Sequence, residues 1–191
     1  MSSETYQKIL NTAHDLFIKQ GYTATSMRQI AEEAGIGKAT IYHHFPDKQT
    51  IVLELLKSTM TRMDEALQMV KAESEPRRRI QVAVGVSLKY LLESADIMQI
   101  VRREVPGGRD QMNDKFLDFF HSYISLLSDA VHQGTEQGIF RSVDPDETAR
   151  TLMTMIQGTF SMAYLGGGKP HSPQKTIDSL LDVYFQGIEV R

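Results

Sequence analysis

A chain of 191 residues can form one large domain or two small ones, and its 41% of hydrophobic residues suffice for a core in either case. The net charge of −3 gives no general sign of a nucleic-acid partner, the absence of cysteine excludes disulfides and thiolate metal sites, and no apolar run is long enough to cross a bilayer. The first twenty residues mix charged and apolar side chains, unlike a signal peptide, so we expect a soluble, cytoplasmic protein without a membrane partner.

Apolar residues recur at intervals of three and four almost throughout, and no stretch alternates with the period of a strand, which predicts an all-α fold. The first helix is expected over about 4–20, where Gly21 ends it because glycine readily takes the positive φ of a helix C-terminus. Ser26 and Gln29 have the spacing of a capping box, which predicts a second, short helix that ends at Gly35.

A third short helix is expected over about 38–44, because Phe45 precedes Pro46 and is pushed out of the α region. Asp47 is typical of an N-cap, and it begins a long helix over about 48–71 that the stretch 73–76 interrupts. Further helices are expected at 76–94, 96–104, 111–137, 145–165 and 173–189, most of them separated by glycine and proline.

Residues 26–45 have the spacing of a helix-turn-helix. Two short helices can cross steeply only over a small residue, which Ala31 provides, and the turn needs a residue comfortable at positive φ, which Gly35 provides. Ile41 then anchors the following helix in the core. An ordinary αα-hairpin in a helical bundle can show the same spacing, so the spacing alone leaves both interpretations open.

The wider segment 16–56 resembles the TetR family of bacterial one-component regulators. The resemblance rests on Ala13, Leu16, Phe17 and Gly21, then Thr25-Ser26, Ile30-Ala31, Ala34-Gly35, Lys38 through Phe45, and Lys48. Gly37 departs from the family, which more often has a hydroxyl residue there. The resemblance implies an operator-bound dimer, usually a repressor, that a small molecule in the C-terminal domain releases from DNA.

The interruption at 73–76, together with this resemblance, indicates the domain organisation. We expect a three-helix DNA-binding domain with the helix-turn-helix over 1–47, a connecting helix over 48–75, and a helical effector-binding and dimerisation domain over 76–191. A ligand that favours a tilted position of the connecting helix would then move the two DNA-binding domains of a dimer out of register.

The third helix is the candidate for base contacts, because Ile41 and Phe45 are expected to point inward and leave its other side chains available. Lys38 can donate to guanine, Ala39 or Thr40 can pack on a thymine methyl group, and the bulkier rings that follow suit phosphate. The expected DNA-contacting residues are Thr25, Ser26, Arg28, Lys38, Ala39, Thr40, Tyr42, His43, His44 and Lys48.

Some of these residues have a second interpretation. Thr25 and Ser26 can serve as helix caps with or without a phosphate contact. Adjacent His43 and His44 can suggest a metal site, but neighbours on a helix point about 100° apart and the sequence has no HExxH motif, so we expect no metal.

One short helix contacts few base pairs, so a homodimer is expected to place two of them about one DNA turn apart on an operator. The family resemblance implies that the last two helices pair with their copies in a four-helix bundle. The expected interface residues are Gly158, Ile177, Leu180, Leu181, Tyr184, Phe185 and Ile188. The same apolar stripe can instead complete the monomer core, and periodicity does not separate the two.

Residues 80–164 are rich in methionine and aromatic residues, which suit an adaptable apolar cavity. The expected pocket residues are Tyr90, Met98, Phe116, Phe120, Tyr123, Met155, Phe160 and Tyr164. We expect no cofactor and an apolar or amphipathic effector of unknown identity, although residues of these types are more often part of the core than of a ligand site. Arg102, Arg103 and His121 can meet an acidic ligand or simply lie in solvent.

Two other classes of function compete with a ligand-gated DNA-binding regulator. The sequence has no nucleophile elbow, phosphate loop, HExxH motif or paired-carboxylate signature, so we do not expect an enzyme. The alternative to a ligand-gated regulator is an effector-independent DNA-binding or adaptor module, which would have a filled core in place of a cavity.

Overall fold

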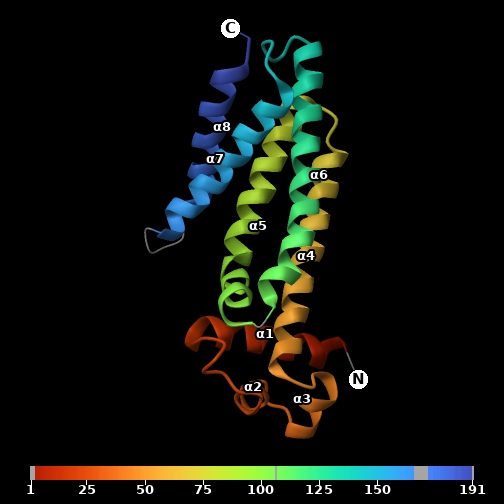
Figure 1. Cartoon of the computed structure of the whole chain (residues 1–191), viewed down its shortest axis with the longest axis vertical. Coiled ribbons are helices and arrows are strands. Elements are labelled where there is room, and N and C mark those ends of the chain that lie inside the picture. Colours follow the sequence, from red (N-terminus) through yellow and green to blue (C-terminus); the bar gives the residue numbers. More distant parts are fainter. Residues whose placement is uncertain (1–2, 106, 166–171, 191) are drawn as a thin grey trace. The chain divides into compact units, whose positions relative to one another are not determined.

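The computed structural model describes residues 3–105, 107–165 and 172–190, including all side chains there except those of 3, 103, 108–116, 160 and 162–165. Over these residues the chain forms eight α-helices and no β-strand, which confirms the predicted all-α fold (Figure 1). The helices are α1 (Ser3–Gln20), α2 (Met27–Glu33), α3 (Lys38–His44), α4 (Lys48–Ala72), α5 (Pro76–Glu104), α6 (Gly108–Glu136), α7 (Pro145–Leu165) and α8 (Pro173–Ile188).

The main difference from the sequence prediction is α5, which runs unbroken where we expected two helices, at 76–94 and 96–104. Ser94 and Ala95 at the expected break are both buried, and neither is a residue that ends a helix. The prediction of a break was therefore wrong, and 29 residues form one helix.

The signals predicted at the end of α1 and at the starts of α2 and α4 are present. Gly21 has a φ of +89° after α1, and Ser26 and Gln29 form the complete capping box of α2. The Asp47 carboxylate accepts the backbone amide of Thr50 at 2.7 Å, as expected of the N-cap of α4.

The helices pack into two units. Unit 1 contains residues 1–61 and 94–115, and unit 2 contains residues 62–93 and 116–191, so α4, α5 and α6 each contribute to both. The domain boundaries expected after residues 47 and 75 concern parts of the chain with separate functions, and they remain a prediction.

The core of unit 1 joins α1, α2, α3, the first half of α4 and the end of α5. Its fully or almost fully buried side chains include Ile9, Phe17, Ile30, Ile41, Phe45, Ile51 and Val101. Burying one such side chain contributes about 1.5–3 kcal/mol, so this apolar set fixes the short helices α2 and α3, which have too few residues to be stable alone.

The core of unit 2 is built from α6, α7 and α8 with parts of α4 and α5. Its largest fully buried side chains are Tyr123, Phe140, Ile80, Leu127, Leu152 and Ile156. None of the described helices has the length and apolar character that crossing a membrane requires.

The C-terminal end of α8 is hydrogen-bonded to the segment between α6 and α7. The Arg141 amide donates to the Ile188 carbonyl at 2.7 Å, and Phe140 and Glu189 form an isolated antiparallel bridge. The Arg77 guanidinium at the start of α5 lies 2.5 Å from the Glu189 carboxylate and over the ring of Phe185. These contacts order the last described residues of the chain.

Candidate nucleic-acid interface

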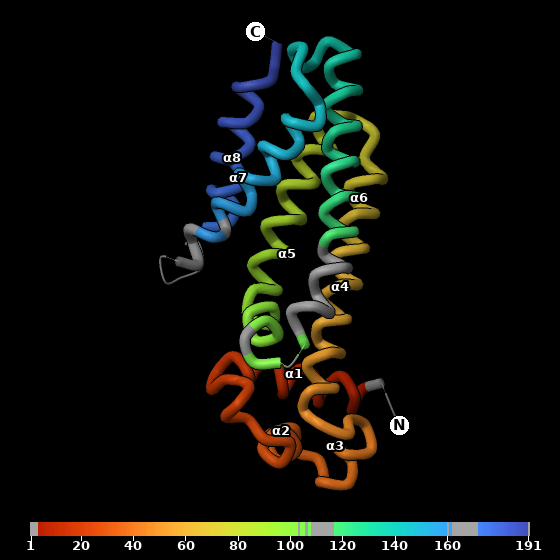
Figure 2. Tube along the Cα trace, viewed as in Figure 1, coloured from red at the N-terminus to blue at the C-terminus, as the bar shows by residue number. Residues whose placement is uncertain are grey.

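The turn between α2 and α3 has the geometry that the sequence predicts. Ala31 is buried where the two helices meet, and Gly35 has a φ of +63° in the turn. The Ile36 amide donates back to the Ala31 carbonyl at 2.9 Å, which closes the turn. Figure 2 shows the trace reversing between the two short helices. The segment is therefore a helix-turn-helix in its backbone as well as in its spacing.

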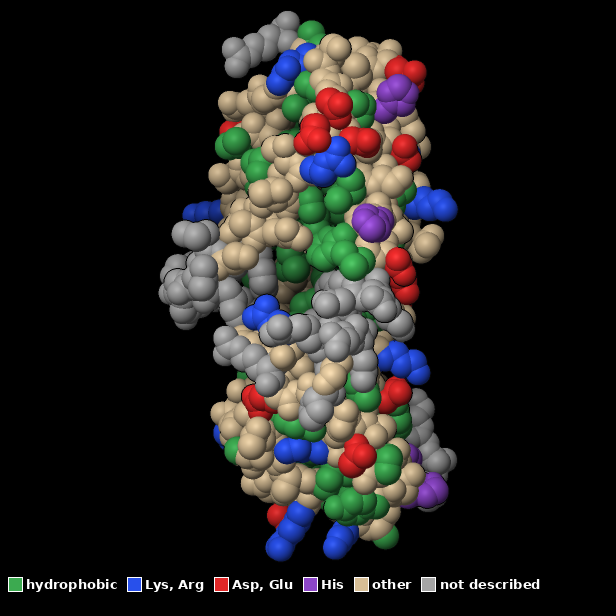
Figure 3. All heavy atoms as spheres, viewed as in Figure 1, with side chains coloured by type: hydrophobic (Ala, Val, Ile, Leu, Met, Phe, Trp, Pro, Cys, Tyr) green, Lys and Arg blue, Asp and Glu red, His purple; other side chains and the backbone are tan. Residues whose placement is uncertain are grey.

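Helix α3 is anchored on one side and exposed on the other. Ile41 and Phe45 are 0% and 1% exposed in the unit 1 core, as predicted. The exposed residues of α3 are Lys38, Ala39, Thr40, Tyr42 and His43. Figure 3 shows basic side chains projecting from the end of unit 1 that carries α2 and α3. An α-helix with hydrogen-bond donors and small residues on its exposed side fits the major groove of DNA.

His44 is less accessible than its neighbours. Its ring lies edge-on to Tyr6, with 6.3 Å between ring centroids, and Tyr6 in turn stacks on Phe45 at 4.8 Å. The Tyr6 hydroxyl donates to the Glu54 carboxylate at 2.8 Å. Burial, together with this bond to Glu54, raises the pKa of Tyr6 to about 12. The C-terminal end of α3 is thus held by α1 and α4.

Two of the expected DNA-contacting residues have their polar atoms bonded inside unit 1. The Thr25 hydroxyl is buried, donates to the Gly21 carbonyl at 2.8 Å and accepts from Gln20. The Lys48 ammonium donates to the carbonyls of Tyr22 and Thr25 and lies 4.2 Å from the centre of the Tyr22 ring. A contact of either residue with DNA stays a prediction.

Ser26 and Arg28 are exposed, but each already has a partner on α2. The Ser26 hydroxyl accepts the Gln29 amide as the N-cap, which is the alternative role that the sequence left open. The Arg28 guanidinium pairs with Glu32 at 2.7 Å. This exposed pair is worth little in stability, so phosphate can compete for the guanidinium.

The predicted effector-pocket residues are distributed over several places. Tyr123 is a buried core residue whose hydroxyl accepts from Ser87 at 2.5 Å. Tyr90 lines a hollow of about 190 Å³ between α4 and α5, and Met155 lines a different one, whereas Met98 belongs to unit 1. Phe120 is half-buried against the core of unit 2. The predicted residues outside the described side chains are Phe116, Phe160 and Tyr164.

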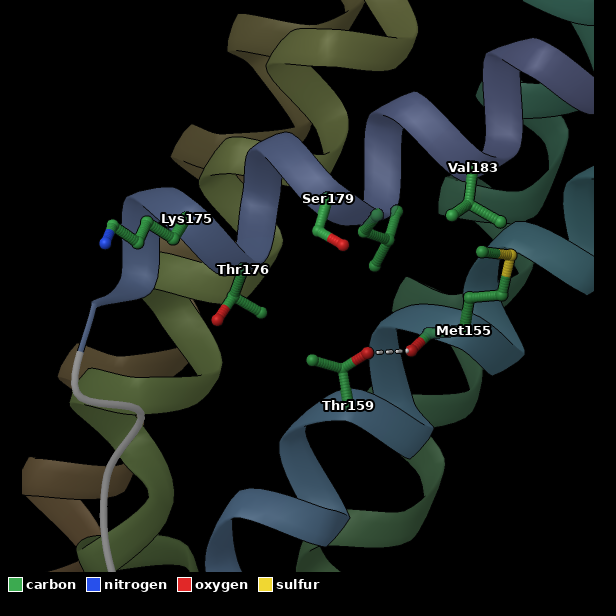
Figure 4. A pocket seen from close by; sticks show the side chains of 7 residues that line it. Met155, Thr159, Lys175, Thr176, Ser179 and Val183 are labelled. Carbon is green, nitrogen blue, oxygen red and sulfur yellow. Dashed lines mark hydrogen bonds between the residues drawn. The ribbon is translucent and has the colours of Figure 1, made fainter.

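A groove of about 500 Å³ lies between α7 and α8 (Figure 4). Hydroxyl and apolar side chains line it, and the Thr159 hydroxyl donates to the Met155 carbonyl at 2.7 Å. Its lining residues are Met155, Thr159, Lys175, Thr176, Ser179, Leu180 and Val183.

The apolar stripe of α8 lies mainly in the core of unit 2. Leu180, Tyr184, Phe185 and Ile188 are buried there, and Ile177 and Leu181 are partly buried against them. The sequence left a dimer interface and a monomer core open for this stripe, and the packing favours the core for the four buried residues. Gly158 on α7 and Val183 on α8 are exposed, so a partner can reach the face that carries them.

Comparison with known proteins gives the class of the chain. The family model of bacterial regulatory proteins of the tetR family matches residues 9–55, and the model of the tetracyclin repressor-like C-terminal domain matches residues 73–187. The HTH-type transcriptional regulator YvkB of Bacillus subtilis is 29% identical over 96% of this chain and 97% of its own. The HTH-type transcriptional repressor KstR2 of Mycobacterium tuberculosis is 26% identical over 95% and 91%, respectively.

A transcriptional regulator from Saccharomonospora viridis, solved in complex with choline, superimposes with a TM-score of 0.73 at 27% identity and covers all of both chains. The two family models together extend over both the helix-turn-helix and the C-terminal helices. The chain belongs to the TetR family. It is a DNA-binding transcriptional regulator, and the sequence resemblance over residues 16–56 is confirmed.

Proposed function

We propose that the chain is a homodimeric, cytoplasmic repressor that binds an operator through α3 and leaves it when a small molecule binds in unit 2. The observation that carries this proposal is the anchoring of α3, whose buried Ile41 and Phe45 fix the direction of its exposed residues. A relative that is 26% identical carries the name of a transcriptional repressor, which supports the direction of regulation. A regulator of this kind needs no catalytic turnover.

The proposed base contacts come from the first turn of α3. Lys38 donates to guanine, and Ala39 or Thr40 packs on a thymine methyl group, since all three are exposed there. Tyr42, which is 46% exposed, and His43 contact phosphate. Ser26, the N-cap of α2, and Arg28 contact the adjacent phosphate backbone of the DNA in this proposal.

The proposed dimer interface is the exposed face of α7 and α8, with the groove between them. Val183 is 61% exposed, and Gly158 has open space where a side chain would stand, so a second copy can approach closely. Two helices from each copy would form a four-helix bundle. The half-buried Ile177 and Leu181 contribute at its edge, whereas the four buried residues of the stripe support it from the core.

The proposed effector is an apolar or amphipathic small molecule. Among the described residues of unit 2, the buried polar side chains are hydroxyls, and no buried charge is available for an ionic group. The ring centroid of Phe119 lies 6.4 Å from that of Tyr90 and 5.7 Å from that of Tyr123, which gives an aromatic environment. The relative from Saccharomonospora viridis was solved with choline, a small organic cation, and such cations bind aromatic faces.

The experiment is a selection of operator sequences from a random duplex pool, followed by titration of the selected and a scrambled duplex at several salt concentrations. We expect the selected duplex to bind at least about 10³-fold more tightly. Lys38→Ala is expected to reduce this ratio, whereas Tyr42→Ala weakens both duplexes alike. Lys71→Ala, at the exposed end of α4, serves as the control. A protein that retains no duplex at low ionic strength would refute the proposal.

A thermal-shift screen of small molecules, with release of the selected duplex as second readout, then tests the effector. Choline, fatty acids and acyl-coenzyme A compounds form the first panel. If no compound in a broad library stabilises the protein and releases DNA, the effector-independent module is the better interpretation.

A further inference from the structure

The segment 21–25, between α1 and α2, is held from two sides by charged side chains that come from distant parts of the chain. Lys48, at the start of α4, donates to the carbonyls of Tyr22 and Thr25. Glu104, the last residue of α5, accepts both the backbone amide and the hydroxyl of Thr23, each at 2.9 Å. The segment 21–25 is therefore hydrogen-bonded to both α4 and α5.

The segment 21–25 leads directly into Ser26, the N-cap of α2. Because α2 has seven residues and packs against α3, a displacement of the segment moves the whole helix-turn-helix. A hydrogen bond to a charged group is stronger than a neutral one, so the two charged side chains are strong restraints on a short turn.

The surroundings of Lys48 support a role inside the protein. Its side chain is half-buried, and burial lowers the pKa of the ammonium while the nearby Glu104 carboxylate acts in the opposite direction. The ring of Tyr22 covers the ammonium at 4.2 Å. An ammonium with two carbonyls and an aromatic face has most of its interactions satisfied before any DNA arrives.

We propose that Lys48 and Glu104 are positioning residues for operator binding, which hold α2 and α3 in their DNA-binding arrangement through the segment 21–25. The inference rests on the proposed operator binding. Lys48 then has a role different from the phosphate contact that its sequence position predicts. Glu104, although acidic, then favours DNA binding.

Lys48→Met tests the first half of the proposal. Loss of a phosphate contact weakens operator and scrambled duplexes equally and reduces the slope of log affinity against log salt by about 0.9. Loss of a positioning contact instead lowers operator affinity, by about tenfold, and leaves the affinity and salt slope on the scrambled duplex unchanged, because nonspecific binding needs no single register. Lys57→Met, at an exposed lysine of the same helix, is the matched control.

Glu104→Ala tests the second half, and here electrostatics and positioning predict opposite signs. Removing a negative charge strengthens binding to any DNA if only the net charge matters. We expect weaker operator binding instead, with faster hydrogen exchange at the Thr23 amide. Glu104→Gln keeps an acceptor oxygen for Thr23 and is expected to retain most of the affinity. Glu136→Ala on α6 is the control for loss of a glutamate.

The outcomes are distinct. A parallel loss on both duplexes with a reduced slope for Lys48→Met, or unchanged or tighter operator binding by Glu104→Ala, overturns the inference and leaves the proposed function intact. A wild-type protein that binds no duplex overturns the proposed function itself. If Lys48→Met does not fold, the two Glu104 variants decide the question alone.

Discussion

Gly134, in the last part of α6, is a position where a single methyl group is expected to be costly. A Cβ atom there would stand 3.1 Å from Cγ of Phe140 and closer than 3.0 Å to Cδ2 and Cε2 of the same ring. Phe140 cannot move aside easily, since it is 1% exposed and stacks on Phe185 with 6.2 Å between centroids. The Gly134 carbonyl also accepts the amides of Ile139 and Phe140, which restrains the backbone at this position.

The expected effect of Gly134→Ala is the balance of two contributions. Alanine in place of glycine inside a helix is favourable by about 1 kcal/mol. Overpacking a filled core costs about 1–3 kcal/mol, and the rigid ring places this site at the upper end of that range. We therefore expect the free energy of unfolding to fall by about 2 kcal/mol, which lowers the Tm by about 4–8 °C in a chain of this size.

The assay is thermal and urea unfolding followed by circular dichroism, at one protein concentration because the Tm of the proposed dimer would depend on concentration. Gly85→Ala is the matched control, since Gly85 also lies inside a helix and a Cβ there has nothing within 4 Å. Only the favourable contribution remains in that variant, so it is expected to be more stable than the wild type by about 0.5–1 kcal/mol.

Equal stabilities of the two alanine variants would refute this reasoning. A double variant provides a second check: Phe140→Leu makes room next to Gly134, so adding Gly134→Ala to it is expected to cost nothing. The interaction energy of that mutant cycle is then about 1–3 kcal/mol. An additive cycle would show that the Phe140 ring is not the obstacle.

Substitutions of Tyr6, Asp47 and Val183 each have a defined expected outcome. Folding raises the pKa of Tyr6 from 10.0 to about 12, so the neutral phenol stabilises the protein fully below pH 10 and this contribution is lost as the pH rises to 12. Tyr6→Phe is therefore expected to reduce the loss of stability at alkaline pH, measured by urea titrations, and an unchanged pH profile would contradict the role of Tyr6. Asp47→Ala removes the N-cap of α4 and is expected to lower the free energy of unfolding by about 1 kcal/mol at pH 7. Hydrogen bonds from Thr50 lower the pKa of Asp47, so its charge stabilises the folded protein above the unfolded pKa. The charge-dependent part of the difference between wild type and variant is therefore expected to disappear as the pH falls through the folded pKa. Val183→Asp is expected to shift the protein toward monomer in sedimentation velocity with its helix content intact, whereas Val190→Asp, at a similarly exposed valine beyond α8, leaves the dimer unchanged.

The short-range chemistry of the helix ends was predictable from the sequence. Gly21, Ser26 with Gln29, and Asp47 each act within four residues of their own position, so a local pattern contains the whole cause. The break expected near residue 95 was wrong for the opposite reason. Ser94 and Ala95 are buried within the continuous helix α5, and a local sequence pattern does not record whether a residue is buried by the rest of the fold.

The site was predictable where one helix face decides it. Ile41 and Phe45 repeat at a spacing that puts both in the core, and the exposed residues of α3 follow from them. Lys48 was harder, because its partners Tyr22 and Thr25 lie more than twenty positions earlier in the chain. The role of Glu104 left no signal in the sequence, since its contact with Thr23 spans 81 positions.

The unbroken course of α5 has a consequence for insertions. A flexible joint near residue 95 would absorb an extra residue, but within a continuous helix one inserted residue turns everything after it by about 100°. Glu104 would then leave the side of the helix from which it reaches Thr23. The direction in which Glu104 points thus depends on the exact number of residues in α5. Insertions in loops are therefore expected to be tolerated better than insertions within α5.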